Sequence, residues 1–164
     1  MQRVLGIDPG LRNTGYGVVD LADNVLEPSL IEAGVLILDH KKSLEHRLDQ
    51  LHRDLDALID EHQPHCLAVE KLYAHYRHPS TAILMAHARG VILLCARQHA
   101  LDVDHLPSTE VKKAVTGYGH ASKLQVQLAV QSQCRLDQPP SPPDVADAIA
   151  IALTHARRLA TQRL

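Results

Sequence analysis

The sequence of 164 residues contains neither phenylalanine nor tryptophan, and only four tyrosines. Hydrophobic residues still make up 45% of the chain, which is enough for an ordinary globular core, so that core must be aliphatic. Because the core does without large aromatic rings, an exposed tyrosine becomes a candidate for stacking on a ligand. A chain of this length usually forms one domain, and we expect a single domain over residues 1–164.

Cysteine is also scarce, and long hydrophobic runs are missing. Cys66, Cys95 and Cys134 lie in apolar or helical surroundings without the paired spacing of a disulfide framework or a zinc site. Such cysteines are typical of buried, reduced thiols in the cytoplasm. The chain has no leader-like start, and no uninterrupted apolar run approaches about 18 residues. We therefore expect a soluble, cytoplasmic protein that does not bind a membrane.

The net charge of the chain is only −2, which at first argues against a nucleic-acid partner. Its distribution argues differently. Residues 1–70 carry 13 acidic and 6 basic residues, whereas residues 71–164 carry 6 acidic and 11 basic residues. An asymmetry of this kind favours a polyanion-binding face, unless the two halves of the sequence do not correspond to separate faces of the molecule.

The pattern of apolar segments predicts an α/β fold. Segments that end in turns predict five strands, at residues 4–7, 14–19, 33–38, 67–70 and 103–106. Short loops join the first three, which favours an antiparallel meander. Leucines at spacings of four and three then predict an amphipathic helix over residues 43–62. Later strands alternate with helices, which indicates a mixed sheet with helices on its faces.

The segment over residues 81–98 predicts a helix that is apolar on nearly all sides. Such a helix is either a central core helix or part of a subunit interface. Gly90 in its middle costs about 1 kcal/mol relative to alanine, and the close approach of another helix is one reason to accept that cost.

Four acidic residues occupy unusual places in this pattern. Asp8 and Glu70 each end a predicted buried strand, while Asp144 and Asp147 open an alanine-rich helix. An acid at the end of a buried strand loses hydration and needs a partner. Two strand-end acids and two acids on one face of a helix could together hold a pair of divalent cations.

Each acid taken alone also has an ordinary structural interpretation. Asp144 follows Ser141 at the spacing of a helix-capping acid after its N-cap residue. Asp8 precedes a Pro-Gly turn, and Glu70 could pair with Lys71. These interpretations stay open at this point, but together they require several independent coincidences.

Asp147 is harder to explain in that way. It lies one turn after Asp144 on the same helix face, and like charges at this spacing destabilise a helix unless a cation lies between them. The chemistry that needs such an arrangement is phosphodiester hydrolysis with two cations about 3.5–4 Å apart, which clamp the attacking and leaving oxygens. Oxygen ligands favour Mg²⁺, or Mn²⁺ in its place.

A set of motifs resembles the RuvC family of Holliday-junction endonucleases. The set runs in order from residue 3 to about residue 158, and it is specific as a whole although no single motif is. Its members are Gly6-Ile7-Asp8-Pro9-Gly10, Arg12-Asn13-Thr14-Gly15-Tyr16-Gly17, Ala68-Val69-Glu70, Ala88-Arg89-Gly90-Val91, Val111-Lys112, Gly117, Gly119, Lys123, and the run from Asp144 to His155.

The resemblance implies a ribonuclease-H-like fold, in which a five-stranded mixed sheet with its first three strands antiparallel is flanked by helices. It implies a structure-selective endonuclease that resolves four-way (Holliday) DNA junctions by symmetric paired nicks, in recombination and DNA repair. It also implies two Mg²⁺ or Mn²⁺ ions in each active site. The partners implied are a second copy, bound through the helix around residues 81–98, and a branch-migrating helicase complex of the RuvA and RuvB type.

The resemblance also assigns roles to individual residues. The catalytic metal ligands that it implies are Asp8, Glu70, Asp144 and Asp147. The residues expected to contact DNA are Tyr73, Arg77, Lys112, Lys113 and Lys123. Tyr73 falls where the family places an aromatic ring that stacks on a junction base, a contact worth roughly 1–3 kcal/mol. Tyr76 in the same loop is an alternative for that role.

Three other functions deserve comparison. A related ribonuclease-H-like nuclease could act on RNA or on flap substrates, and a non-catalytic subunit could bind junctions without needing all four acids. An actin-like ATPase fragment is a third alternative, since Gly-Ile-Asp-Pro-Gly also resembles a phosphate loop of that superfamily. Such ATPases need a second glycine-rich phosphate loop and a second domain, and this chain shows neither.

Overall fold

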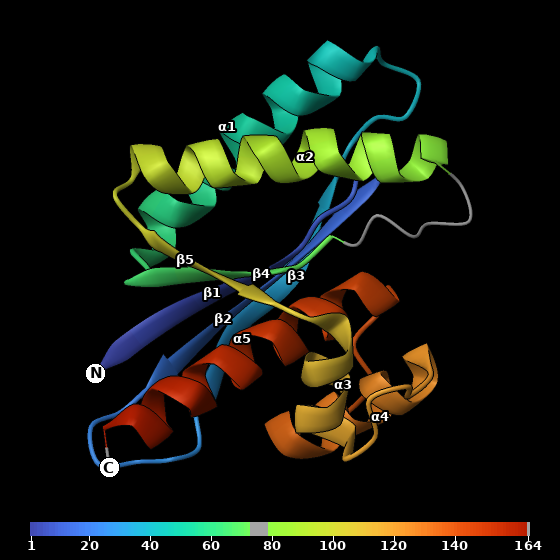
Figure 1. The fold of residues 1–164 in the computed structure, drawn as a ribbon. Coiled ribbons are helices and arrows are strands. Elements are labelled where there is room, and N and C mark those ends of the chain that lie inside the picture. Colours follow the sequence, from blue (N-terminus) through green and yellow to red (C-terminus); the bar gives the residue numbers. More distant parts are fainter. Residues whose placement is uncertain (73–78, 164) are drawn as a thin grey trace.

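The computed structural model of the protein describes residues 1–72 and 79–163 (Figure 1). The strands are β1 (Gln2–Asp8), β2 (Asn13–Leu21), β3 (Ser29–Ile37), β4 (Cys66–Glu70) and β5 (Asp102–Leu106). The helices are α1 (Leu44–His62), α2 (Pro79–Gln98), α3 (Ser108–Thr116), α4 (Lys123–Cys134) and α5 (Pro143–Gln162). Each element that we expected from the sequence is present, with ends that shift by a few residues.

The strands form one mixed sheet in the order β3-β2-β1-β4-β5. β1 pairs antiparallel with β2, and β2 with β3, because the short connections between them allow only hairpins. β4 pairs parallel with β1, and β5 with β4, each after a helical crossover. The predicted α/β fold, with a mixed sheet whose first three strands are antiparallel, is confirmed.

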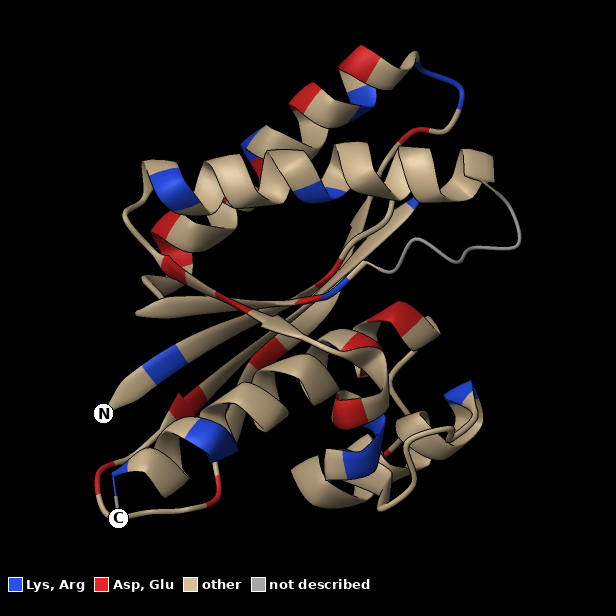
Figure 2. Cartoon of the chain, viewed as in Figure 1, with Lys and Arg blue, Asp and Glu red and all other residues tan. Residues whose placement is uncertain are grey.

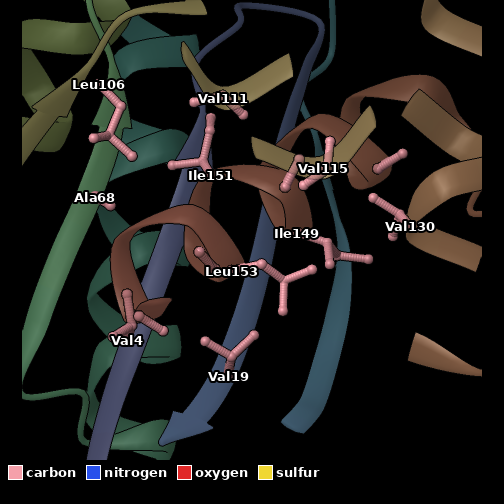
Figure 3. Packing of buried hydrophobic residues seen from close by; sticks show 14 of the residues in the cluster. Val4, Val19, Ala68, Leu106, Val111, Val115, Val130, Ile149, Ile151 and Leu153 are labelled. Carbon is pink, nitrogen blue, oxygen red and sulfur yellow. The ribbon is translucent and has the colours of Figure 1, made fainter. Parts of the chain in front are cut away.

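Helices cover both faces of the sheet (Figure 1), so the core has two halves. The strand alternation divides the side chains of β1 between these halves: Val4 faces α3, α4 and α5, whereas Leu5 and Ile7 face α1 and α2. Figure 3 shows the first half, in which Ile149, Ile151 and other aliphatic side chains meet the strands. The aliphatic core that the composition predicts is therefore present on the α5 side.

Helix α5 lies unusually close to the sheet because glycines face it. A Cβ atom at Gly6 would lie 2.6 Å from the backbone nitrogen of Ala152, and one at Gly17 would lie 2.9 Å from the Cα atom of Ile149. Real Cβ atoms do not approach so closely, so only glycine permits this contact. The main chain of α5 consequently rests on β1 and β2 with no side chain between them.

Helix α2 leaves much of its apolar surface exposed. Ile83 is 58% exposed and Leu94 is 56% exposed, so α2 is not the central core helix that was one of two expectations. A Cβ atom on Gly90 would meet nothing within 4 Å among the described residues, so no close helix approach explains this glycine within one chain.

By length and composition alone, α2 also passes as a membrane-spanning helix, the single such helix in residues 1–72 and 79–163. This is weak evidence, since a helix that covers a protein interface can have the same composition. His87, Arg89 and Arg97 interrupt its apolar residues.

Candidate active site

The sheet brings the first two acids together. β1 and β4 run parallel, and their register pairs Ile7 with Val69, so Asp8 and Glu70 are the next residues at the same sheet edge. Asp8 ends β1 and Glu70 ends β4. The side chains therefore come from neighbouring strand ends, although about sixty residues separate them in the sequence.

Helix α5 brings the other two acids to the same place. Asp144 and Asp147 lie in its first two turns. Gly15, which pairs with Asp8 across β1 and β2, faces the backbone carbonyl of Asp144 so closely that a Cβ atom there would collide with it. This contact holds the start of α5 against the end of β1, where Asp8 lies.

All four acids line one cleft with a volume of about 960 Å³. Basic and polar side chains complete its wall. Figure 2 shows acidic segments in the first turns of α5 and basic segments on α3 and α4. These further cleft residues include Arg12, Asn13, His40, Arg47, Ser108, Lys112 and Lys123.

Around Asp8, the negative charges of the cleft outweigh the positive charge that faces them. Burial and the carboxylates of Asp147, Glu70 and Asp144 together raise the pKa of Asp8 well above its usual range, while Lys123 acts in the opposite direction with a smaller effect. Each of these carboxylates therefore lies near enough to Asp8 to disfavour its ionised form.

Glu70 and Asp147 show the same imbalance. Burial raises the pKa of Glu70, with Asp147 as the next cause, whereas Lys112 and the Ser108 hydroxyl lower it. Burial also raises the pKa of Asp147, and Lys123 and Lys112 offset part of this effect. The two lysines thus neutralise only part of the acidic charge.

The ordinary interpretations of single acids find no support in the structure. The N-cap of α5 is Pro142, not Ser141, and no side chain makes a capping hydrogen bond there, so Asp144 is not part of a capping pair. Among the ion pairs of the described residues, none joins Glu70 to Lys71. Asp8 belongs to a strand and not to a turn.

Hard divalent cations fit this site. The donors are carboxylate oxygens, which Mg²⁺ and Mn²⁺ prefer, and they lie in a cleft where their own charges repel. A cation bound by Asp8, Glu70, Asp144 and Asp147 would remove that repulsion. The cleft is also wide enough to admit a phosphate group beside the ions.

Several contacts hold the strand ends that carry the acids. The Thr14 hydroxyl donates to the Gly10 carbonyl at 2.7 Å and accepts from the Gly10 N–H at 3.2 Å, which closes the loop after β1. Arg47 donates to the Leu11 carbonyl at 3.3 Å. Arg89 donates to the backbone carbonyl of Glu70 at 3.2 Å and thereby holds the end of β4.

Two basic residues of the cleft, Arg12 and Arg47, were not predicted from the sequence. Arg12 stands within one of the family-like motifs, which is a signal that could have revealed it. Arg47 lies in the first turn of α1 among exposed charged residues, and no sequence signal marks it. Both come from the acidic first half of the sequence, so the two halves do not correspond to separate faces.

The residues expected to contact DNA divide into three groups. Lys112 and Lys123 line the cleft. Lys113 is exposed on α3 and does not line it. Tyr73, Tyr76 and Arg77 lie outside the described residues, so their roles stay predictions.

The comparisons with known proteins agree on one family. The family model for "Crossover junction endodeoxyribonuclease RuvC" matches residues 4–155. A protein of that name from Rhodopirellula baltica is 47% identical over 150 residues, which cover 92% of this chain and 83% of the relative. One from Alkaliphilus metalliredigens is 40% identical and covers 93% of this chain and 92% of the relative.

The solved structures lead to the same result. RuvC from Thermus thermophilus in complex with a Holliday junction substrate is 31% identical, with a TM-score of 0.88 and coverage of 99% of this chain and 97% of that one. The yeast mitochondrial Holliday junction resolvase Ydc2 is 16% identical with a TM-score of 0.68, which supports the fold alone; it covers 99% of this chain and 85% of that one. The chain belongs to the RuvC family of crossover junction endodeoxyribonucleases.

Proposed function

We propose that this protein is an endonuclease that resolves four-way DNA junctions by symmetric paired nicks, in recombination and DNA repair. The observation that carries the proposal is the convergence of four carboxylates, from β1, β4 and α5, in one cleft. Membership of the RuvC family supports the junction as substrate, because a relative of this fold binds a Holliday junction.

In this mechanism Asp8, Glu70, Asp144 and Asp147 would hold two Mg²⁺ ions, which Mn²⁺ could replace. The bound ions would supply the charge that polarises the scissile phosphate and the attacking water. Lys112 and Lys123 would contact DNA phosphates near the acids, since both lie in the cleft wall. Arg89 keeps Glu70 in place through its main chain and is a positioning residue.

The other functions considered fit these observations less well. A binding subunit without activity would gain nothing from three acids whose pKa values are raised by burial and by neighbouring carboxylates. An ATPase of the actin-like class would need a second glycine-rich phosphate loop, and the sequence shows none. A nuclease specific for RNA or for flaps shares the same chemistry, and only the substrate distinguishes it.

A homodimer suits paired nicks, because the four acids of the described residues line one cleft and two simultaneous nicks would use two such clefts. The surface that supports dimerisation is an apolar groove of about 510 Å³ on α1 and α2. Its lining residues are Leu48, Ile83, Ala86, His87, Gly90, Val91 and Leu94. The open space above Gly90 suits the close approach of α2 from a second copy.

The proposal also includes a cytoplasmic location and helicase partners of the RuvA and RuvB type.

The experiment that tests the proposal compares substrates under equal conditions. An immobile four-way junction, a linear duplex, a flap and a hairpin RNA are incubated with the protein in Mg²⁺ or in excess chelator. We expect symmetric nicks in two strands of like polarity in the junction, in Mg²⁺ only. Equal cleavage of the flap or of the RNA would contradict the junction assignment while leaving the nuclease assignment intact.

A further inference from the structure

We propose a second metal site, remote from the cleft, in which Cys95, His99 and Asp56 bind one Zn²⁺ or a similar transition-metal ion. Cys95 lies in the last turns of α2, His99 directly follows that helix, and Asp56 lies on α1. The sequence gives no zinc-like spacing for this group, because it contains one cysteine and because Asp56 lies far from Cys95 and His99 along the chain. None of the three residues lines the active-site cleft.

The ligand atoms already lie close together. The sulfur of Cys95, a ring nitrogen of His99 and a carboxylate oxygen of Asp56 are all within 4.8 Å of one another. His99 Nε2 is 2.7 Å from Asp56 Oδ1, and the two would separate slightly to admit an ion between them. The N–H of His99 donates to the Cys95 carbonyl at 3.2 Å, so the two α2-side ligands stay one helical turn apart on the same face.

The three ligand side chains differ in exposure, as in a metal site that is open to solvent on one side. Cys95 is fully buried, the His99 side chain is 21% exposed, and the Asp56 side chain is 47% exposed. An ion bound to the thiol sulfur at the base would thus have protein ligands on three sides and water on the fourth. Three protein ligands and one open position are a common arrangement for Zn²⁺.

A fourth residue lies near the other ring nitrogen of the histidine. Asp60 Oδ1 lies 3.7 Å from His99 Nδ1, on the opposite side of the ring from Asp56. Metal-binding histidines usually donate their other N–H to a carboxylate, which fixes the tautomer with a free lone pair on the ligating nitrogen. A small movement that brings Asp60 within hydrogen-bond distance of Nδ1 would do this for His99 and leave Nε2 for the ion.

The donor atoms differ in kind from those of the cleft. Sulfur, nitrogen and oxygen together favour Zn²⁺ or Co²⁺ over Mg²⁺, which prefers oxygen alone. Burial and the two aspartates raise the pKa of the Cys95 thiol to about 11. The thiol therefore holds its proton in the absence of metal, and on binding the sulfur forms its bond to the ion while this proton passes to solvent.

Bound metal would tie α1 to α2. The two helices already share a hydrogen bond between His52 and Gln98, at 2.7 Å. An ion held by one residue of α1 and two at the end of α2 would add a link that the unfolded chain lacks. We therefore expect Zn²⁺ to stabilise the folded protein without taking part in nicking.

The test is a titration of the intact protein with Co²⁺ in excess Mg²⁺, which occupies the cleft. A tetrahedral site with a thiolate ligand gives an intense sulfur-to-cobalt absorption band, whereas Co²⁺ bound by the carboxylates of the cleft gives none. We expect the band to saturate at one equivalent per chain and to disappear when Zn²⁺ is added. Absence of the band in the folded wild-type protein would overturn the proposal.

Variants identify the ligands. His99→Gln keeps a donor for Asp56 but loses the ligating nitrogen, and it should weaken Zn²⁺ binding by at least about tenfold. Cys95→Ser should abolish the band. Cys134→Ser, which removes a half-buried thiol on α4, is the matched control and should keep it. A band that persists in Cys95→Ser would assign it to another thiol.

A second readout guards against misfolding of a variant at the buried position. In saturating Mg²⁺, which occupies the cleft, added Zn²⁺ should raise the melting temperature of the wild type and of Cys134→Ser, but not that of His99→Gln or Asp56→Asn, whose side chains reach solvent. All four proteins should nick junctions at the wild-type rate in Mg²⁺. An equal thermal shift in His99→Gln would mean that Zn²⁺ binds elsewhere, and the proposed site would be rejected.

Discussion

Gly15 on β2 and Asp144 on α5 touch through their main chains, in a contact that leaves no room for a Cβ atom at residue 15. Such an atom would collide with the Asp144 carbonyl oxygen and lie 3.2 Å from the nitrogen of Val145. The position of the α5 acids relative to Asp8 therefore depends on the absence of a side chain from a neighbouring strand.

Replacement of Gly15 by alanine tests this dependence. The added methyl group must push α5 away from β2, and we expect the free energy of unfolding to fall by about 1–3 kcal/mol. Nicking should fall by about 100-fold, since small displacements of catalytic groups are costly. Denaturant unfolding and a nicking assay well below the melting temperature measure the two effects. A fully active Gly15→Ala protein would show that the contact does not position the acids.

Asp147→Asn separates catalysis from binding. Under the proposed function, the substitution removes one metal ligand and one repulsive charge but keeps the shape of the side chain. We expect nicking to fall by at least about 100-fold, because loss of even an outer partner of a metal ligand costs 10–100-fold. Junction affinity, measured by gel shift in Ca²⁺ or without metal, should be retained.

The matched control for this substitution is Asp137→Asn. Asp137 is an exposed aspartate in the connection between α4 and α5, and it does not line the cleft. Its variant should nick at the wild-type rate. If both variants nick normally, Asp147 is not a catalytic ligand.

The free energy of unfolding of the metal-free protein should depend on pH, because the cleft raises the pKa values of three acids. Asp8, Glu70 and Asp147 have raised pKa values in the folded state, so the folded protein binds more protons than the unfolded chain above about pH 4. The free energy of unfolding should therefore fall as the pH rises from about 4 through these raised pKa values.

A difference measurement isolates this effect from other titrating groups. The wild type should lose more stability than Asp147→Asn as the pH rises from about 4 to neutrality, and Mg²⁺ should reduce that loss. Chemical denaturation at several pH values, with and without Mg²⁺, provides the comparison. If the stability of the two proteins changed with pH in parallel, Asp147 would not have a raised pKa in the folded protein.

Neighbouring lysines allow a matched test of DNA contacts. Lys112 lines the cleft and lowers the pKa of Glu70, whereas Lys113 is exposed outside it. We expect Lys112→Ala to weaken junction binding and to reduce the slope of log affinity against log salt by about 0.9. Lys113→Ala should have a smaller effect, although the sequence suggested both residues as contacts. Equal effects would extend the DNA path beyond the cleft.

The exposed face of α2 supplies a test of dimerisation. Leu94 is 56% exposed in one chain, so Leu94→Gln should change the stability of the folded monomer by no more than about 0.5 kcal/mol. We expect it to convert the dimer to a monomer in sedimentation analysis and to abolish paired nicks. Leu128→Gln, at a 48% exposed leucine on α4, is the control and should remain dimeric.

Residue patterns along the chain were enough to locate the elements and the acids. Asp8 and Glu70 stood out because each ends a short apolar strand, and the leucine spacing of α1 marked a helix with one buried face. The family resemblance supplied the ribonuclease-H-like fold. Local patterns could not supply it, because the register of β1 with β4 joins residues about sixty positions apart.

Tertiary contacts account for what the sequence did not reveal. Arg47 joins the cleft only because α1 packs beside the loop after β1, where it donates to the Leu11 carbonyl. Asp56 meets Cys95 only because α1 and α2 lie side by side. One local prediction was wrong. The sequence pattern matched Ser141 as the N-cap of α5, but the helix begins after Pro142 and has no side-chain cap.

The distribution of the carboxylates along the chain has a consequence for biosynthesis. Asp8 and Glu70 leave the ribosome early, whereas Asp144 and Asp147 belong to the last helix. Until that helix docks on the glycine-bearing strands, a nascent or truncated polypeptide lacks two of the four acids that line the cleft. We therefore expect polypeptides that end before α5 not to nick DNA.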